Sequence, residues 1–248
     1  MSVSVTKPLF YQAVVPIDTK VHGKTRLGRP KQPLAYARKA NIIPALIDEF
    51  DSAMGELPIV FIPGATQPSV VFVTSSEPGA NAFISEDGLW AGAYVPAYLR
   101  RYPFIIGDVQ GGDSVLCIDD TYAGLSETEG ARLFDDKGNS KPPLTEALAI
   151  SKSYRDAGAR TEAFCGKLLE FGLLQSATLD TTKPEGGKST MHGILVVSEG
   201  ALAELNAEQV FELHQAGYLR AIYNHLASLR SVSNLRHGVA AQKDAADV

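Results

Sequence analysis

The connections between the β-rich runs of this chain are short. Residues 57–62 and 69–74 are separated by a Pro63-Gly64 turn, and residues 104–106 and 115–118 by a Gly-rich turn. A parallel pair of strands needs a crossover of about a dozen residues or more, so each of these pairs is expected to be antiparallel. The sequence therefore predicts a largely antiparallel sheet.

Helical sequence patterns precede and follow these β-rich runs along the chain. Residues 41–53 are expected to form a first helix, and apolar residues recur at helical spacing over residues 144–171, where Gly158 is a potential break. A capping-box pattern begins at Asn206, and residues 219–229 carry the apolar stripe of a final helix. Strands and helices together predict an α+β fold.

We expect a single domain. Prolines and glycines interrupt residues 1–40, which predicts an irregular N-terminal arm. Residues 41–239 are expected to form one α+β domain whose mainly antiparallel sheet is covered by helices, and residues 240–248 a flexible polar tail. Within the domain, residues 176–190 are rich in Thr, Ser, Gly and Lys and predict a mobile loop.

Composition limits the class of protein. The chain is 45% apolar and 21% charged, as is typical of a folded globular protein, and its formal net charge of -5 argues against nucleic acid as a partner. No apolar run is long enough to span a bilayer, and the N-terminal residues lack the pattern of a signal peptide. We therefore expect a cytoplasmic protein without a membrane span. Two cysteines, Cys117 and Cys165, are too few for a disulfide framework.

The most unusual stretch is residues 87–104. Six of its aromatic and basic side chains also carry a polar or charged group, which makes them costly both to bury and to expose: Trp90, Tyr94, Tyr98, Arg100, Arg101 and Tyr102. The stretch is therefore either the centre of the core or a recognition surface. We call these six residues the aromatic-Arg motif.

The two arginines of the motif are expected to have separate roles. Pro96 favours a helical turn up to Arg101, and Pro103 forces the residue before it out of the helical region. Neighbouring residues on a helix lie about 100° apart, so Arg100 and Arg101 cannot readily share one ligand. We expect one arginine to be held by a carboxylate as a brace. The other is expected to face a cleft lined by Tyr94, Tyr98 or Trp90.

Candidates for proton transfer are few. His22, Glu49 and Asp119 are the side chains considered, although capping or turn formation is the favoured role of Asp119. No cluster of His, Cys, Asp or Glu has metal-ligand spacing, and the Gly-Gly turn lacks the rest of a phosphate-binding loop. The sequence thus predicts no metal and no cofactor. A basic segment, residues 20–39, carries seven Lys or Arg and no acid, and could meet a phosphate, a polyanion or an acidic face of the protein itself.

Five segments together resemble the SapC family of bacterial proteins. They are Pro58-Ile-Val-Phe61, Tyr94-Val-Pro-Ala-Tyr-Leu-Arg-Arg-Tyr-Pro-Phe104, Cys117-Ile-Asp119, Leu133-Phe134-Asp135 and Gly217-Tyr-Leu with Tyr223 and Leu226-Ala-Ser-Leu229. The resemblance implies an accessory protein associated with surface-layer loci, or encoded beside flavin-dependent tryptophan-halogenase-like proteins, cupin-like proteins and TonB-dependent receptors. Some relatives carry a peptide-transporter permease label, which conflicts with the lack of a predicted span. The resemblance supplies no catalytic residue.

Three hypotheses about function follow. The first is a binding or accessory protein whose aromatic-Arg motif recognises a small ligand or a protein partner. The second is an enzyme, or the catalytic partner of a flavin-dependent halogenase-like oxidoreductase, in which the arginines orient a substrate and His22, Glu49 or Asp119 moves a proton. The third is a purely structural motif with both arginines paired internally. An arginine left free in a pocket would favour binding. The sequence does not predict the oligomeric state.

Overall fold

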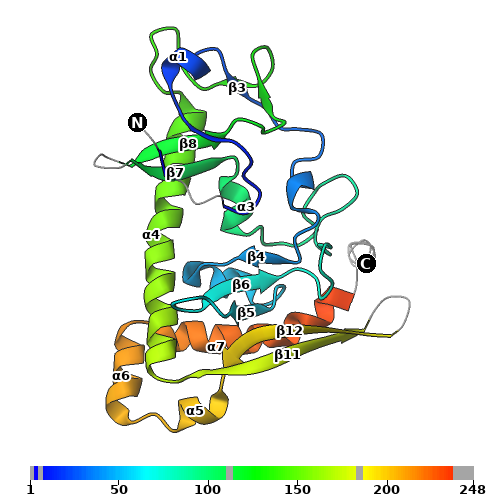
Figure 1. Ribbon diagram of the computed structural model, residues 1–248, viewed down its shortest axis with the longest axis vertical. Helices are drawn as coiled ribbons and strands as arrows, with labels where there is room; N and C mark the ends of the chain where they lie inside the picture. The colour runs from blue at the N-terminus through cyan, green and yellow to red at the C-terminus, as the bar shows by residue number, and fades with distance from the viewer. Residues whose placement is uncertain (1–2, 5–7, 110–113, 183–186, 237–248) are drawn as a thin grey trace, which may run out of the picture.

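The computed structural model describes residues 3–4, 8–109, 114–182 and 187–236. Within these residues every sheet pairing is antiparallel, and helices pack on the sheets. One long helix, α4 (Pro142–Glu170), runs along most of the molecule and connects the largest sheet to two smaller sheets at the other end (Figure 1). The predicted fold class, an α+β domain with mainly antiparallel sheets and covering helices, is confirmed.

The largest sheet has five strands. Their spatial order is β11 (Leu174–Thr182), β12 (Lys188–Val197), β5 (Ile59–Ile62), β6 (Ser69–Val73) and β4 (Ile42–Pro44). The predicted pairing of β5 with β6 is confirmed, with Ile59 opposite Phe72. Both faces of these two strands are buried: Ile59 and Phe72 join the cluster that contains α4 residues, while Val60 and Val71 join a cluster on the other face. This explains why both strands are apolar at consecutive positions.

Two smaller sheets lie at the other end of α4. One has the order β1 (Val3–Ser4), β7 (Phe104–Val109), β8 (Val115–Asp119) and β2 (Val14–Pro16), and the other β10 (Ala131–Arg132), β3 (Arg26–Leu27) and β9 (Leu125–Ser126). The predicted pairing of β7 with β8 is confirmed, and its Gly-rich turn lies outside the described residues. Residues 8–40 supply β2, β3, the single-turn helix α1 (Thr19–His22) and the 3₁₀ turn η1 (Ala35–Ala37).

Helix α4 joins the cores at both ends of the molecule. Leu144 and Ala147 pack in the core beside β8, whereas Phe164 and Leu168 pack in the core beneath the five-stranded sheet. Gly158, expected as a potential break, lies within the uninterrupted helix.

The C-terminal helices follow the five-stranded sheet. They are α5 (Glu199–Ala203), α6 (Ala207–Gln215), α7 (Tyr218–Ser228) and the 3₁₀ segment η3 (Leu229–Arg236). The predicted capping box of α6 is confirmed: Asn206 accepts a hydrogen bond from the Gln209 N–H, and the Gln209 side chain accepts one from the Asn206 N–H. Gly217 turns the chain from α6 into α7 with a φ of 73°, a conformation that glycine adopts without strain.

Two expectations about secondary structure were wrong. Residues 42–44, expected at the start of a helix, form β4, and only η2 (Ile47–Glu49) and α2 (Phe50–Ala53) are helical. The reason is tertiary: Ile42 and Ile43 pair with β6, where β-branched side chains pack well. Residues 176–190, expected as a loop, belong mostly to β11 and β12, apart from residues 183–186, which lie outside the described residues.

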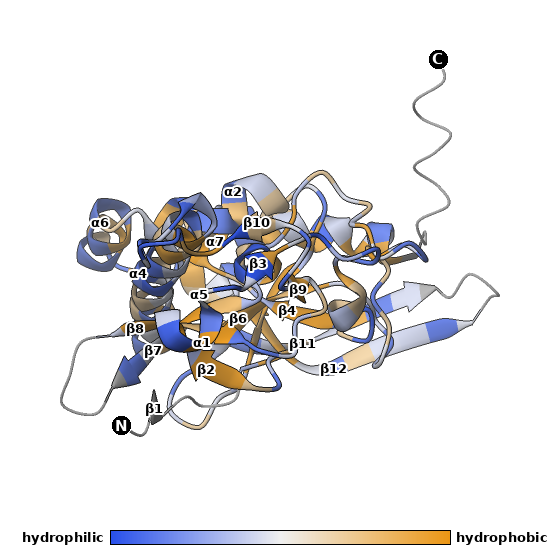
Figure 2. Ribbon diagram, turned by 90° about the horizontal axis from the view of Figure 1, so that it is seen from above, coloured by the Kyte–Doolittle hydropathy of each residue, from blue (hydrophilic) through white to orange (hydrophobic). Residues whose placement is uncertain are grey.

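Hydropathy follows this arrangement. In Figure 2 the strands β4 and β6 at the centre of the view are strongly hydrophobic, whereas the peripheral helix α6 is mostly hydrophilic. The part of the chain that the structure describes contains no helix long and apolar enough to cross a membrane.

Candidate functional site

The aromatic-Arg motif lies between the two ends of the molecule, against the middle of α4. Its helical turn is α3 (Ala97–Arg101), for which Pro96 is the N-terminal cap residue. Tyr102 is extended, with φ -63° and ψ 136°, and the chain then enters β7. The helix-to-strand change predicted from Pro96 and Pro103 is therefore present, and it directs Arg100 and Arg101 into different surroundings.

Arg101 is enclosed by three aromatic rings. Its guanidinium carbon lies 4.0 Å from the ring centroid of Tyr154, 4.5 Å from that of Tyr98 and 5.8 Å from that of Tyr11. Within the described residues it forms no ion pair, and its buried Nε makes no hydrogen bond. The expected carboxylate brace is thus replaced by aromatic faces, whose negative quadrupoles attract the cation. We call Arg101 and these tyrosines the Arg101 cage.

Replacing Arg101 with lysine should lower the free energy of unfolding by about 1–2 kcal/mol, because a compact ammonium cannot stack on several rings as a planar guanidinium does. Urea unfolding monitored by circular dichroism measures this loss. Arg100→Lys is the matched control and should stay within about 0.5 kcal/mol of the wild type. Equal losses in both variants would show that the two arginines have the same structural role.

Arg100 faces a pocket of about 400 Å³. The guanidinium is exposed, and its Nε donates to the Val95 carbonyl at 3.0 Å while Nη2 donates to the Tyr94 hydroxyl at 3.2 Å. One wall of the pocket is the face of α4 that carries Ile150 and Tyr154. We call this the Arg100 pocket. Because Tyr154 belongs to both the pocket and the Arg101 cage, the cage supports the pocket wall from behind.

A hydrogen-bond chain leads from Arg100 into the protein. The Tyr94 hydroxyl accepts from Arg100 and donates to Glu49 Oε1 at 2.8 Å. Glu49 is only 4% exposed and also accepts from the N–H groups of Ala97 at 2.6 Å and Leu46 at 2.9 Å. Burial raises the pKa of Glu49, although these hydrogen bonds partly oppose the effect. Burial and the neighbouring Glu49 raise the pKa of Tyr94 to about 12, so Tyr94 stays a neutral donor.

One of the two carboxylates that line the Arg100 pocket is neutralised by an ion pair. Asp48 lines the Arg100 pocket and is paired with Arg160 of α4. Arg100 itself forms no ion pair within the described residues. The nearest carboxylate, Glu49, also lines the pocket and interacts with Arg100 electrostatically, but it is buried behind the Tyr94 hydroxyl.

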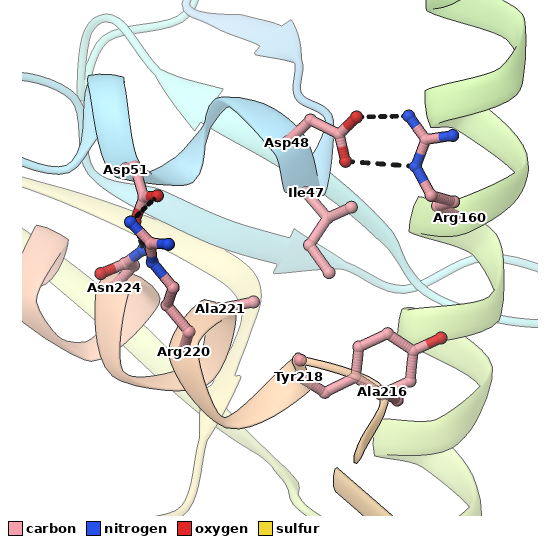
Figure 3. Close-up of a pocket in the computed structure, with 10 residues that line it drawn as sticks. Ile47, Asp48, Asp51, Arg160, Ala216, Tyr218, Arg220, Ala221 and Asn224 are labelled. Carbon is pink, nitrogen blue, oxygen red and sulfur yellow. Dashed lines mark hydrogen bonds and ion pairs between the residues drawn. The ribbon is translucent and has the colours of Figure 1, made fainter. Parts of the chain in front are cut away.

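A second pocket, of about 290 Å³, lies between η2, α4 and α7 (Figure 3). Two ion pairs flank it: Asp48 with Arg160, and Asp51 with Arg220 of α7. Asn224 also donates to Asp51. These ion pairs hold the segment that carries Glu49 between α4 and α7. Because every charge in the two pairs is matched, the pocket shows no preference for an anion or a cation.

Asp119 and Tyr102 lie apart from the Arg100 pocket. Asp119 is fully buried and accepts hydrogen bonds from the N–H groups of Gln12, Ala13 and Thr121, the Thr121 hydroxyl and the Tyr102 hydroxyl. Burial alone would raise the pKa of Asp119, but the hydrogen bonds outweigh it and hold the pKa below its usual value. Its oxygens are occupied, which favours anchoring over proton transfer.

His22 and Trp90 are also remote from the pocket lining. His22 is 2% exposed, and its Nε2 lies 3.6 Å from Asp120 Oδ1. Trp90 stacks on Phe83 with ring centroids 5.2 Å apart, and its buried Nε1 has no hydrogen-bond partner among the described residues. Of the predicted site residues, the structure therefore brings together Glu49, Tyr94 and Arg100 in one pocket. Tyr98 and Arg101 form the supporting cage.

Two important rings were not predicted as site residues. Tyr154 lies within the apolar helical pattern of residues 144–171, and Tyr11 lies in the N-terminal segment. Nothing in the local sequence of either residue indicates an arginine partner, because their contact with Arg101 arises from the tertiary fold.

Metal-ligand clusters and reactive thiols are two further kinds of site considered. No three His, Cys, Asp or Glu side chains in this part of the chain come together as metal ligands. Cys117 and Cys165 are buried free thiols, and burial raises the pKa of Cys165 to about 11, which disfavours the reactive thiolate.

Fold and site define a class: an α+β protein in which a tyrosine-caged arginine lies behind the wall of a small pocket that a second arginine lines. Residues 17–235 match the family model described as SapC, and the chain belongs to the SapC family. The comparisons give no match among curated proteins or solved structures.

Proposed function

We propose that the chain is a binding protein that holds a small anion with an apolar body in the Arg100 pocket. The observation that carries this proposal is the exposed Arg100 guanidinium, which faces a pocket and forms no ion pair within the described residues. A free arginine in a pocket is what separates ligand binding from a purely structural motif. The proposal assigns Arg100 to the ligand and Arg101 to the architecture.

The surroundings of Arg100 favour a carboxylate. A planar guanidinium forks onto carboxylate oxygens, and Tyr94 and Tyr154 add aromatic surface beside it. Leu46, Ala97 and Ile150 supply apolar walls for the body of the ligand. A pocket of about 400 Å³ suits a small organic acid rather than a polymer.

Binding is favoured over catalysis because no proton-transfer group is open to a ligand. Glu49 already accepts three hydrogen bonds, and Asp119 and His22 do not line the pocket. One observation supports the alternative of an enzyme, or a catalytic partner of a flavin-dependent halogenase-like oxidoreductase: Glu49 has a raised pKa and reaches the pocket through Tyr94. In that alternative Tyr94 would relay a proton to Glu49.

The proposed setting is an accessory role. Two buried free thiols are compatible with a reducing cytoplasm. Surface-layer assembly or TonB-dependent uptake, which the resemblance implies for SapC proteins, would supply the ligand or partner. The second candidate occupant is a carboxylate side chain of a protein partner, which would present the same group to the exposed Arg100.

Benzoate should bind the wild-type protein more tightly than its neutral analogue benzamide, as measured by isothermal titration calorimetry. Arg100→Gln should weaken benzoate binding at least about tenfold, equivalent to about 1.4 kcal/mol, because the amide cannot form a charged fork. The same variant should keep the wild-type melting temperature. Equal binding of benzoate and benzamide, or unchanged benzoate binding by Arg100→Gln, would contradict the proposal.

A further inference from the structure

Two arginines face each other across the three-stranded sheet. Arg26 of β3 pairs directly with Arg132 of β10 in the antiparallel register. Side chains directly opposite in such a pair have Cβ atoms about 4.5–5.5 Å apart, and like charges there are destabilising. Both arginines, together with Lys141, line a pocket of about 500 Å³. The small sheet lies at the end of the molecule where α4 begins (Figure 1).

Carboxylates of the protein neutralise this cluster only in part. Arg26 Nη1 donates to the Gly130 carbonyl at 3.0 Å and forms no ion pair within the described residues. Arg132 pairs with Asp136 at 2.6 Å, but the Asp136 side chain is 85% exposed. An ion pair so open to water contributes at most about 1 kcal/mol, so an incoming anion can displace Asp136.

Lys141 adds a third charge that local rules do not explain. It is the residue before α4, where the positive end of the helix dipole disfavours a cation, and its side chain provides no cap. Asp135 lies near enough to interact with it electrostatically, but the Asp135 oxygens are held by Lys137 N–H and by Asn139. Three cations therefore line one pocket, although the Arg26–Arg132 pair and the dipole of α4 both disfavour this arrangement.

The backbone at the start of α4 does not provide an anion site of its own. Pro142 and Pro143 have no N–H, and the N–H groups of Leu144 and Thr145 both bond to the Lys141 carbonyl. Any anion in this pocket is therefore held by the side chains of Arg26, Arg132 and Lys141.

We propose that this pocket binds the phosphoryl group of a small molecule. A phosphoryl dianion offers three oxygens to the two guanidiniums and the ammonium, and it removes the Arg26–Arg132 repulsion that the sheet otherwise bears. Glu146 also lines the pocket, and its carboxylate offsets one of the three cations. Once Asp136 is displaced, two positive charges are left to match a dianion. Arg26 belongs to the basic segment, residues 20–39, so the proposed site gives this segment a role in anion binding. It is separate from the Arg100 pocket and does not depend on the function proposed there.

Titration with inorganic phosphate and with phenyl phosphate, followed by calorimetry and thermal melts, tests this site. Arg26→Gln should weaken binding at least tenfold. Without phosphate, this variant should melt at or above the wild-type temperature, because the like-charge repulsion is gone. A purely structural Arg26 would instead lower the melting temperature. Binding of both probes assigns the site to phosphate esters, and binding of inorganic phosphate alone assigns it to the free ion.

Two variants serve as controls. Arg29→Gln removes an exposed charge from the same basic segment outside the pocket and should leave phosphate binding unchanged. Arg100→Gln should also bind phosphate normally, so that failure of one site is distinguishable from failure of the other. No binding of either probe, or equal weakening in Arg26→Gln and Arg29→Gln, would overturn the proposal.

Discussion

Replacing Asp119 with asparagine should lower the free energy of unfolding by about 3–4 kcal/mol, since hydrogen bonds to a charged group contribute about 1.5–3 kcal/mol each. Oδ2 accepts from Gln12 N–H at 2.7 Å, and Oδ1 accepts from Ala13 N–H at 3.1 Å and the Thr121 hydroxyl at 2.7 Å. An amide keeps the shape but points an NH₂ group at one set of donors. Urea unfolding measures the loss.

Asp120→Asn is the matched control. Asp120 is the next residue and its side chain is 49% exposed, so this change should cost less than about 1 kcal/mol. The contribution of Asp119 should persist above its ordinary pKa and disappear only as the pH falls below 4, because its folded pKa is lowered. If Asp119→Asn and Asp120→Asn were equally stable, the hydrogen bonds to Asp119 would not be what anchors residues 12 and 13 to β8.

The sequence correctly predicted those elements that depend on residues close together in the chain. The β5–β6 and β7–β8 pairs follow from short connections, and α6 begins where its capping box indicates. Residues 42–44 were mispredicted because pairing with β6 overrides the helical pattern. The β11–β12 hairpin was missed because many of its side chains face solvent. The polar composition of residues 176–190 therefore resembled that of a loop, although its threonines favour a strand.

In the candidate site, too, features that depend on neighbouring residues could be predicted, whereas those that depend on tertiary contacts could not. Separate surroundings for Arg100 and Arg101 follow from their adjacency on a short helical turn, and this could be predicted. The identity of the brace could not, because Tyr11 and Tyr154 reach Arg101 from distant parts of the chain. Likewise, the opposition of Arg26 and Arg132 depends on a strand register that no pattern in the sequence indicates.

Acid should destabilise the protein through His225, a fully buried residue of α7. Its Nδ1 lies 2.8 Å from the Ile59 carbonyl of β5, and its Nε2 accepts from the Val197 N–H of β12 at 3.0 Å. The ring thus joins two strands whose register includes only one residue pair, Leu195 with Phe61. These contacts require the neutral ring with its proton on Nδ1, because a proton on Nε2 would face the Val197 N–H. Burial lowers the pKa of His225 to about 4.

The direction of the pH effect follows from this lowered pKa. As the pH falls below 6.5, the unfolded chain takes up a proton at His225 while the folded protein does not, so stability falls until the pH reaches about 4. A difference of about 2.5 pKa units corresponds to about 3 kcal/mol. Urea unfolding at pH 7.5 and pH 4.5 should therefore differ by about 2–3 kcal/mol from this residue alone.

His225→Gln should flatten this pH dependence, because glutamine does not titrate. It should also lower stability at pH 7.5, since an amide cannot bridge Ile59 and Val197 in the same geometry. His214→Gln, at an exposed position on α6, is the control and should keep the wild-type pH profile. The window between pH 6.5 and pH 4 lies above that of Asp119, so the two effects separate in one titration. A profile for His225→Gln that parallels the wild type would show that groups other than this histidine cause the acid destabilisation.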